Sequence, residues 1–335
     1  QQHAAVTAPP GPALVIAGAG SGKTRTLTYR VAWLLDNGIP AKNILLLTFT
    51  NKAALEMLDR VESLVPMNTR DIWGGTFHSV GNRILRRDAE LLGFRSSYSI
   101  MDREDQKDLM TTVVAESDID PKAVRFPKPQ VLTDIYSLAV NTGTSVAELV
   151  EERYPYFDHL RDQIVALRDA YEAKKLETNS MDFDDLLVIC LRLLSEIPAI
   201  AEGYQRRFEF VLVDEYQDTN HIQSELIDLF ARPQRNLMVV GDDAQSIYSW
   251  RGADFRNILD FPERYAGAQV FKIETNYRSV PEILDLANEA IRLNYNQFPK
   301  ELAADRPLRS MLPARVPTND PATQAAFVAQ RILEL

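Results

Sequence analysis

This chain of 335 residues has a single cysteine, no long apolar run and no excess of basic residues. Each of these features excludes a class of protein or partner. The only cysteine is Cys190, which rules out a disulfide framework and is typical of a reducing compartment. The longest apolar runs, such as Ile44–Leu47, have the length of a core strand and fall far short of the roughly 20 residues of a membrane helix. We therefore expect no membrane partner, a cytoplasmic location and a buried, unreactive Cys190.

The charge balance is acidic. There are 37 Lys and Arg against 47 Asp and Glu, a formal net charge of −10. Most phosphate-binding surfaces are basic, so this balance by itself argues against a nucleic-acid partner. A protein can still confine its basic residues to one groove and stay acidic elsewhere. The net charge is therefore only weak evidence against a nucleic-acid partner, and specific motifs carry more weight.

Strand and helix patterns alternate in both outer parts of the chain. Alternation of this kind predicts an α/β fold with a parallel sheet covered by helices on both faces. The length exceeds that of one ordinary core, so two or more domains are expected. The predicted strands are Ala13–Ala17, Ile44–Thr48, Ile72–Phe77, Phe210–Val213, Leu237–Val240 and Val270–Ile273, and the predicted helices are Lys23–Asp36, Lys52–Leu64 with Asn51 as N-cap, a helix from Phe77 to about Leu92, and Pro281–Leu293.

The middle of the chain, from Arg103 to about Phe208, shows almost only helical periodicity. An all-helical subdomain inserted into the α/β domain is the natural interpretation. Towards the end of the chain, Phe298–Thr323 is rich in Pro and Arg and is predicted to be a loop, and Ala325–Leu335 begins a helix. The clearest helices of the insertion are Asp105–Glu116, Val131–Val140, Val146–Glu152 and Phe157–Glu177.

A glycine-rich turn follows the first predicted strand and opens the first long helix, which is the context that a P-loop requires. The usual pattern is G-x-x-x-x-G-K-S/T, and Ala17 replaces its first glycine here. Glycines let backbone N–H groups curl around phosphate oxygens, and the helix N-terminus favours anions. Lys23 would reach the β- and γ-phosphates, and the Thr24 hydroxyl would bind Mg²⁺. The phosphate-binding candidates are Gly18, Ala19, Gly20, Ser21, Gly22, Lys23 and Thr24.

A second half-site ends the strand at Phe210–Val213. Asp214 occupies the Walker B position, where a carboxylate would hold Mg²⁺, and Glu215 would polarise an attacking water as a general base. An acidic strand end facing solvent is the plain alternative. The P-loop elsewhere in the chain favours the functional interpretation, with ATP and Mg²⁺ as ligands.

Six motifs follow one another in a fixed order. They are AGAGSGKT at 17–24, TFTNKAA at 48–54, TFHS at 76–79, VDEYQDTN at 213–220, VGDDAQSIYSWRGA at 240–253 and NYRS at 276–279. In order and spacing, from Gln2 to about Asn294, the chain resembles superfamily 1 DNA helicases of the UvrD/Rep/PcrA group. The resemblance implies a RecA-like ATP-binding domain 1A at residues 1–98 and 181–275, the helical subdomain 1B at 99–180 and an incomplete start of a second RecA-like domain, 2A, at 276–335.

The resemblance also implies roles at the nucleotide. Gln2 is similar to the family's adenine-reading glutamine, and Arg25 would lie near the nucleotide. Gln245 resembles the glutamine that senses the γ-phosphate and links it to the DNA groove. Tyr277 would stack on adenine, and Arg278 resembles the arginine finger, with a surface ion pair as its plain alternative.

Single-stranded DNA is usually held by aromatic stacking inside a basic groove. The motifs offer Phe49, Tyr248 and Trp250, with Arg251 beside them, at strand ends where open α/β sheets bind ligands. Each of these aromatic residues could instead pack in the core. For Phe77, DNA contact and core packing both stay open. Asn51, Thr76 and His78 belong to the same motifs and complete the predicted DNA contacts. His78 has no cluster of partners that would make it a metal ligand.

Taken together, the resemblance implies an ATP-driven motor on single-stranded DNA and its junctions with duplex, moving 3′→5′ in repair or replication. The later family motifs, which carry a second arginine and further DNA contacts, have no counterpart here, so we expect this chain alone to bind nucleotide weakly and hydrolyse it poorly.

A translocase without unwinding and the motor half of a helicase–nuclease are the nearest alternatives. A P-loop small-molecule kinase gives no reason for QSIYSWRGA, and a non-catalytic scaffold gives none for an intact phosphate site. The acids at Asp182, Asp184 and Asp185 are interpreted as a helix N-terminus. The pathway, protein partners and oligomeric state are left open.

Overall fold

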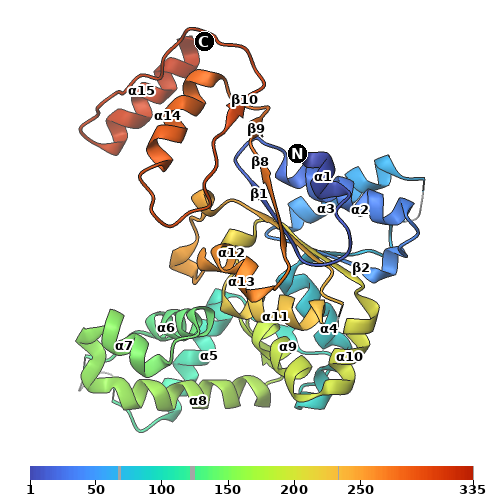
Figure 1. The fold of residues 1–335 in the computed structure, drawn as a ribbon. Helices are drawn as coiled ribbons and strands as arrows, with labels where there is room; N and C mark the ends of the chain where they lie inside the picture. The colour runs from blue at the N-terminus through green and yellow to red at the C-terminus, as the bar shows by residue number, and fades with distance from the viewer. Residues whose placement is uncertain (67–68, 121–124, 233, 335) are drawn as a thin grey trace.

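A six-stranded parallel sheet forms the centre of the molecule in the computed structural model, which describes residues 1–66, 69–120, 125–232 and 234–334 (Figure 1). Every neighbouring pair of strands in this sheet is parallel. The predicted α/β fold of RecA type is confirmed. The strand order is β3 (Trp73–Thr76), β2 (Ile44–Thr48), β6 (Phe210–Val213), β7 (Leu237–Gly241), β1 (Ala13–Ala17) and β8 (Gln269–Ile273).

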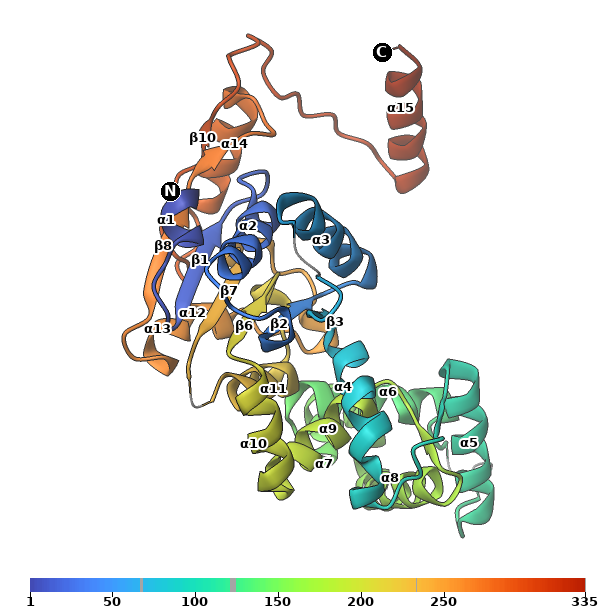
Figure 2. The same cartoon turned by 90° about the vertical axis from the view of Figure 1, so that its right-hand side faces the viewer.

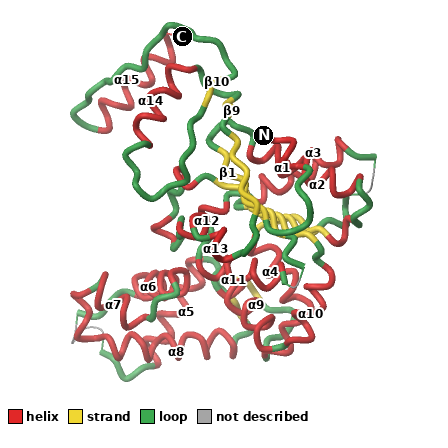
Figure 3. Tube along the Cα trace, viewed as in Figure 1, coloured by secondary structure: helices red, strands yellow, loops and turns green. Residues whose placement is uncertain are grey.

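Both faces of the sheet are buried because successive side chains of a strand point to opposite sides. In β2, Ile44 and Leu46 enter one apolar cluster, whereas Leu45 and Leu47 enter the other. Figure 3 shows the twisted sheet between two layers of helix. One layer holds α1 (Gln2–Val6), α2 (Lys23–Asp36) and α3 (Asn51–Leu64), and the other holds α4 (Phe77–Asp88), α9 (Asp185–Glu196), α10 (Pro198–Arg207) and α11 (His221–Ala231).

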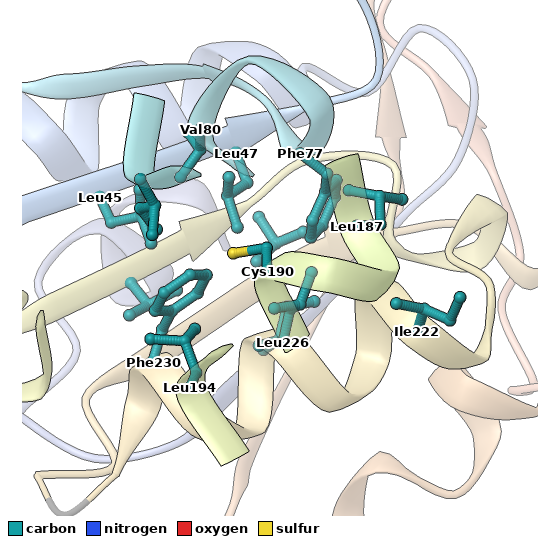
Figure 4. Packing of buried hydrophobic residues seen from close by; sticks show 14 of the residues in the cluster. Leu45, Leu47, Phe77, Val80, Leu187, Cys190, Leu194, Ile222, Leu226 and Phe230 are labelled. Carbon is teal, nitrogen blue, oxygen red and sulfur yellow. The ribbon is translucent and has the colours of Figure 1, made fainter. Parts of the chain in front are cut away.

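Cys190 lies in the second layer as a fully buried side chain among aliphatic and aromatic residues (Figure 4). Burial raises the pKa of the Cys190 thiol to about 12, so it stays protonated and inert at neutral pH. Phe77 is only 5% exposed and packs in the same cluster, which decides in favour of core packing for this residue.

Four helices of the middle segment have an apolar core of their own, built from residues such as Met110, Leu132 and Ile164. Two of the four helices have capped N-termini, since Asp102 and Ser145 each form a capping box. The chain enters and leaves this unit through two short paired strands. The elements are β4 (Ser99–Ile100), α5 (Arg103–Glu116), α6 (Pro129–Thr142), α7 (Val146–Arg153), the 3₁₀ turn η3 (Pro155–Leu160), α8 (Arg161–Glu177) and β5 (Ser180–Met181).

The C-terminal segment leaves the sheet after β8. It forms β9 (Thr275–Asn276), α14 (Pro281–Ile291), β10 (Ala303–Ala304) and α15 (Pro321–Glu334), and β9 pairs with β10. Figure 2 shows α15 standing apart from the rest of the molecule, and all its described residues are exposed. In the described part of the chain, no helix combines the length and apolar character needed to cross a membrane. The remaining short elements are η1 (Ala41–Asn43), η2 (Ala89–Leu92), η4 (Tyr216–Asp218), η5 (Asp243–Gln245), η6 (Ser249–Arg251), α12 (Arg256–Leu259) and α13 (Phe261–Arg264).

Several boundaries differ from the predictions for local reasons. Asn51 is the first residue of α3 rather than its N-cap, because the Thr50 hydroxyl accepts the hydrogen bond from Ala53 N at 3.1 Å. The helix predicted from residue 157 starts at Arg161, after the 3₁₀ turn η3. The predicted loop at 298–323 contains β10 and the first turn of α15, whose predicted last residue, Leu335, lies outside the described residues.

The acids at the start of α9 do more than favour a helix N-terminus. Asp182 and Asp185 each accept a hydrogen bond from the other's backbone N–H, at 2.9 and 2.8 Å, and α9 begins at Asp185 as predicted. Lys175 lies between them, with Nζ at 3.1 Å from Asp182 and 2.7 Å from Asp185. This buried ion pair ties the last helix of the middle unit, α8, to the helix layer of the sheet.

Candidate active site and DNA-contact surface

The predicted functional motifs meet at one edge of the sheet. Parallel strands all point the same way, so the loops that follow their carboxyl ends lie side by side, where open α/β sheets bind ligands. Gly18 follows β1, Phe49 follows β2, Asp214 follows β6 and Asp242 follows β7. The strand order places β6 and β7 beside β1 and β2, which brings motifs about 200 residues apart into one site.

The phosphate loop runs from Gly18 to Thr24 between β1 and α2. Gly20 and Gly22 have φ of 79° and 91°, values that L side chains rarely adopt. Ser21 closes the loop, since its hydroxyl donates to Gly18 O at 2.7 Å. The N-cap of α2 is Gly22 and no side chain caps it, so the first backbone N–H groups of the helix stay available to an anion.

Lys23, Thr24, Asp214 and Glu215 come together at the base of this loop. Lys23 Nζ is buried, lies 2.9 Å from Glu215 Oε2 and makes no well-oriented hydrogen bond. The Thr24 hydroxyl donates to Asp214 Oδ2 at 3.3 Å, and Asp214 Oδ1 accepts from Glu215 N at 3.0 Å. Glu215 has φ of 51°, a left-handed conformation that turns its carboxylate towards Lys23.

Asp214 is a buried carboxyl group with a perturbed titration. Burial, together with the neighbouring charge of Glu215, raises the pKa of Asp214 to about 6. Lys23 and the hydrogen bonds from Glu215 N and Thr24 oppose this rise. A hydroxyl and a carboxylate at this spacing are suitable oxygen ligands for Mg²⁺, whose charge would favour the ionised carboxylate.

A hydrogen-bond relay connects the end of β6 with the end of β7. The fully buried Gln217 side chain donates to Glu215 Oε2 at 2.9 Å and accepts from Asp242 N at 3.0 Å. Asp242 in turn accepts a short hydrogen bond from the amide of Gln245. Gln245, the residue proposed as a phosphate sensor, is therefore connected to the Glu215 carboxylate through Asp242 and Gln217.

The NYRS motif lies directly against the phosphate loop. Asn276 Nδ2 donates to Ala19 O at 2.5 Å, and Tyr277 N donates to Gly20 O at 3.0 Å. A Cβ added to Gly20 would come within 2.6 Å of Arg278 Cβ, so the loop approaches this segment too closely for any larger residue. Tyr277 and Arg278 are both exposed beside the loop.

Two further nucleotide-site candidates come from helices α1 and α2. Gln2, on α1, donates from Nε2 to Ser21 O at 2.7 Å and would clash with any Cβ at Gly22. Arg25 is exposed on α2, and its guanidinium lies 5.3 Å from the centre of the Tyr29 ring. The phosphate loop is thus in contact with Gln2, Tyr277 and Arg278, and Arg25 follows it directly on α2.

Three aromatic rings form a row across two strand ends. The Phe49 and Tyr248 ring centres are 4.7 Å apart, and those of Tyr248 and Trp250 are 6.5 Å apart. Trp250 is 61% exposed, and the Arg251 guanidinium lies 4.4 Å from the centre of its ring. A row of two half-buried rings and one exposed ring, ending in a cation, offers what stacked bases and a phosphate backbone require.

The other predicted DNA contacts have mixed surroundings. Asn51 is exposed at the first turn of α3, whereas the Thr76 hydroxyl is used to cap α4 by accepting from Ser79 N at 3.2 Å. Burial lowers the pKa of His78, so its imidazole is neutral at pH 7 and offers no cationic contact. The His78 ring lies 6.0 Å from that of Phe183, an exposed aromatic residue that the sequence interpretation did not single out.

Comparison with known proteins agrees with this geometry. A family model described as the UvrD/REP helicase N-terminal domain matches residues 1–266, which is most of the chain. The chain belongs to the UvrD/REP helicase family. The residues that the sequence did not point to are those whose side chains link one motif to another or to the C-terminal segment. Gln217 and Asn276 were inside quoted motifs but carried no role, and Lys300, which contacts Asp242, carried no sequence signal at all.

Individual relatives in the UvrD/REP family are also similar over most of this chain. The ATP-dependent DNA helicase PcrA of Bacillus subtilis (strain 168) is 45% identical over 302 residues, which are 90% of this chain and 40% of that protein. PcrA of Staphylococcus epidermidis is 43% identical and PcrA of Staphylococcus aureus (strain Mu50) is 42% identical, each over 303 residues that cover 90% of this chain and 41% of the relative. The chain therefore spans about 40% of the length of the curated relatives that it matches.

Proposed function

We propose that this chain is the ATP-binding part of a DNA helicase motor that couples ATP hydrolysis to movement on single-stranded DNA. The observation that carries the proposal is the meeting of an intact phosphate loop and an aromatic row at one sheet edge, where Gln217 joins Glu215 to the loop that carries Tyr248 and Trp250. Membership of the UvrD/REP helicase family and the similarity to PcrA helicases support it.

The phosphate loop would hold ATP through its backbone N–H groups and Lys23. An incoming phosphate would take Lys23 from Glu215, which frees that carboxylate to orient a water molecule. Tyr277 and Gln2, which both contact the loop, would meet the base. Arg278 would neutralise charge on the transferred phosphoryl group, a contribution of about 10³–10⁵ in rate where such fingers have been measured.

Mg²⁺ would be held by the Thr24 hydroxyl and Asp214. When bound, it neutralises charge on the phosphate oxygens during transfer. The oxygen atoms of these two residues already face each other at 3.3 Å, which suits a shared cation. Gln245 would report whether a γ-phosphate is present, because its amide can exchange Asp242 for a phosphate oxygen.

Phe49, Tyr248 and Trp250 would stack on successive bases, and Arg251 would meet a phosphate. Each stacked base contributes about 1–3 kcal/mol with little regard for sequence. The mode of binding suits single strands and junctions with duplex. Resemblance to the family implies 3′→5′ movement, a cytoplasmic location and a role in repair or replication. We also propose the division of the chain into 1A (1–98 and 181–275), 1B (99–180) and the start of 2A (276–335).

The test compares the wild-type chain with Lys23→Ala. Binding of a fluorescent, non-hydrolysable ATP analogue and of oligo-dT would be titrated, each with and without the other, and ATP turnover would be measured beside them. We expect nucleotide binding that Lys23→Ala abolishes, reciprocal coupling to oligo-dT and low turnover. Nucleotide binding that ignores oligo-dT would instead point to an NTPase with another partner. High DNA-stimulated turnover would contradict only the expectation that this chain is poorly active alone.

A translocase that moves without unwinding is the second candidate. The DNA contacts proposed above would hold a single strand. None of them is assigned a role in separating the strands of a duplex. Strand displacement on a tailed duplex, measured beside displacement of a protein block from single-stranded DNA, separates the two functions. Removal of the block without displacement of the strand would favour the translocase.

A further inference from the structure

A buried lysine from the C-terminal segment reaches into the loop that follows β7. Lys300 Nζ lies 2.7 Å from Asp242 Oδ1 and 2.6 Å from Asp243 Oδ1. The side chains of Lys300, Asp242 and Asp243 are only 5%, 4% and 2% exposed. Burial by itself lowers the pKa of Lys300, but the two carboxylates reverse this and raise it above its usual value, so the ammonium stays charged.

The loop that Lys300 contacts holds the proposed γ-phosphate sensor. Asp242 accepts hydrogen bonds from Gln245 and from Ala244 N, and its own N–H donates to Gln217. Two adjacent buried carboxylates would repel each other without a cation between them. Lys300 therefore offsets this repulsion and holds Asp242 where it accepts from Gln245.

The segment around Lys300 also contacts the phosphate loop. We call Phe298–Leu302 the strap. Phe298 N donates to Asp243 Oδ2 at 3.3 Å, and the Leu302 side chain lies so close to Gly18 that an added Cβ there would come within 2.6 Å of it. One strap thus contacts both the proposed sensor loop and the loop proposed to hold the phosphates.

We propose, on the basis of the function proposed above, that Lys300 is a positioning residue for γ-phosphate sensing. It sets the position of Gln245 through Asp242 and couples occupancy of the phosphate site to the strap and thereby to the C-terminal segment. Lys300 itself contacts neither phosphate nor DNA. Its removal should affect recognition of a triphosphate much more than recognition of a diphosphate.

The test uses the 335-residue chain and two nucleotides, ATPγS and ADP, both with Mg²⁺. Lys300→Met removes the charge and keeps most of the length of the unbranched side chain, whereas Lys300→Arg keeps the charge. Lys272→Met is the matched control. The Lys272 ammonium donates to Pro299 O of the same strap at 2.6 Å but forms no ion pair with Asp242 or Asp243.

We expect Lys300→Met to weaken ATPγS binding by about tenfold or more and ADP binding by less than about threefold, as loss of a charged hydrogen-bond network near one phosphate would do. Lys300→Arg and Lys272→Met should keep the wild-type ratio of the two affinities. Equal weakening of both nucleotides by Lys300→Met, or a fall in thermal stability with an unchanged ratio, would overturn the proposal by reducing Lys300 to a structural ion pair.

A second pair of variants covers the case in which Lys300→Met does not fold. Asp243→Asn leaves Lys300 paired with Asp242, and Lys300→Met with Asp243→Asn restores the net charge of the wild-type cluster. The double variant should lose ATPγS affinity relative to Asp243→Asn alone, and equal affinities would contradict the proposal. Failure of the proposed function is distinguishable, since the wild-type chain would then bind neither nucleotide, or Lys23→Ala would bind both.

Discussion

At the scale of single residues, the most informative feature is the strained backbone at the end of β6. Glu215 adopts a left-handed conformation that costs about 1–3 kcal/mol for a non-glycine residue, and the fold compensates by pairing its carboxylate with Lys23. The buried ammonium of Lys23 makes no well-oriented hydrogen bond in this arrangement. A phosphate oxygen would supply the missing acceptor, so the site is prepared for an anion.

Lys23→Ala should therefore abolish nucleotide binding while leaving the fold intact. Without its ammonium the loop keeps its backbone N–H groups but loses the cation that would meet the β- and γ-phosphates. Isothermal titration with ATPγS checks this, and circular dichroism checks the fold. Lys42→Ala, a change at an exposed lysine of η1, is the control and should bind as wild type does.

Nucleotide binding should depend on pH through Asp214. Its pKa is raised from 3.8 to about 6, so below about pH 6 a proton on the carboxyl competes with Mg²⁺. The Mg²⁺-dependent part of ATPγS affinity should increase as pH rises from 5 to 7 and then level off. Titrations at several pH values with Mg²⁺ or EDTA measure this, and Asp214→Asn should remove the dependence.

The same raised pKa affects stability with the opposite trend. Between the ordinary pKa and about pH 6 the folded chain keeps a proton that the unfolded chain has released. Asp214 thus contributes stability that is fully present below its ordinary pKa and is lost as pH rises through about 6. A stabilising contribution that instead grows over this interval would contradict the assignment.

At the scale of elements, the aromatic row joins the ends of β2 and β7. Trp250→Ala should weaken oligo-dT binding by roughly 5- to 150-fold, the equivalent of about 1–3 kcal/mol for one lost stacking partner. Affinity for ATPγS alone should stay unchanged. Fluorescence anisotropy of labelled oligo-dT provides the measurement. Tyr295→Ala removes a fully exposed ring outside this row and is the matched control.

The loop after β7 is also fixed against helix α6. Gly252 has φ of 83°, and an added Cβ would come within 2.7 Å of Asn141 O in α6. Gly267 has φ of 84° but no atom within 4 Å of an added Cβ. Alanine at Gly267 therefore carries only the backbone strain, of about 1–2 kcal/mol.

Gly252→Ala should lower the free energy of unfolding more than Gly267→Ala does, because it adds a clash with α6 to the same strain. Urea denaturation of both variants measures the difference. Gly252→Ala should also weaken oligo-dT binding, since Trp250 and Arg251 precede this glycine directly. Equal loss of stability in the two variants would show that the loop moves freely against α6.

At the scale of the whole molecule, the middle helical unit is joined to the sheet by buried polar contacts. Asn141 Nδ2 donates to Asp184 at 2.8 Å, and Asn220 Nδ2 donates to Asn141 Oδ1 at 2.6 Å. Lys175 supplies the ion pair with Asp182 and Asp185. These contacts connect the helical unit to the VDEYQDTN motif and to helix α9.

Lys175→Met should therefore destabilise the chain by about 3–5 kcal/mol, because it leaves two buried carboxylates without their cation. Guanidinium denaturation followed by circular dichroism measures the loss. Lys174→Met is the sequence-adjacent control. Its ammonium pairs with Glu116 and Glu177 at the surface, both at 3.2 Å, and such pairs contribute about 0–1 kcal/mol.

The sequence alone determined the kind of elements and the chemistry of the site. Buried strands such as Ala13–Ala17 and the glycine-rich turn after it are local patterns, so the residues carry the information without their neighbours in space. Boundaries were less certain where two residues compete for one role, as Thr50 and Asn51 do at the start of α3. Phe77 could not be assigned to core or surface, because it stands where a strand ends and a helix begins, next to both the core and the ligand-binding edge of the sheet.

Only the tertiary structure decided which distant residues complete the site. Lys300 meets Asp243 across 57 positions of the chain, and Asn276 meets Ala19 across 257. Such pairs depend on the strand order β3-β2-β6-β7-β1-β8, which differs from the order along the chain. Burial then sets their charge states, as at Asp214 and Lys300, since desolvation is a property of the packed molecule and has no counterpart in a string of residues.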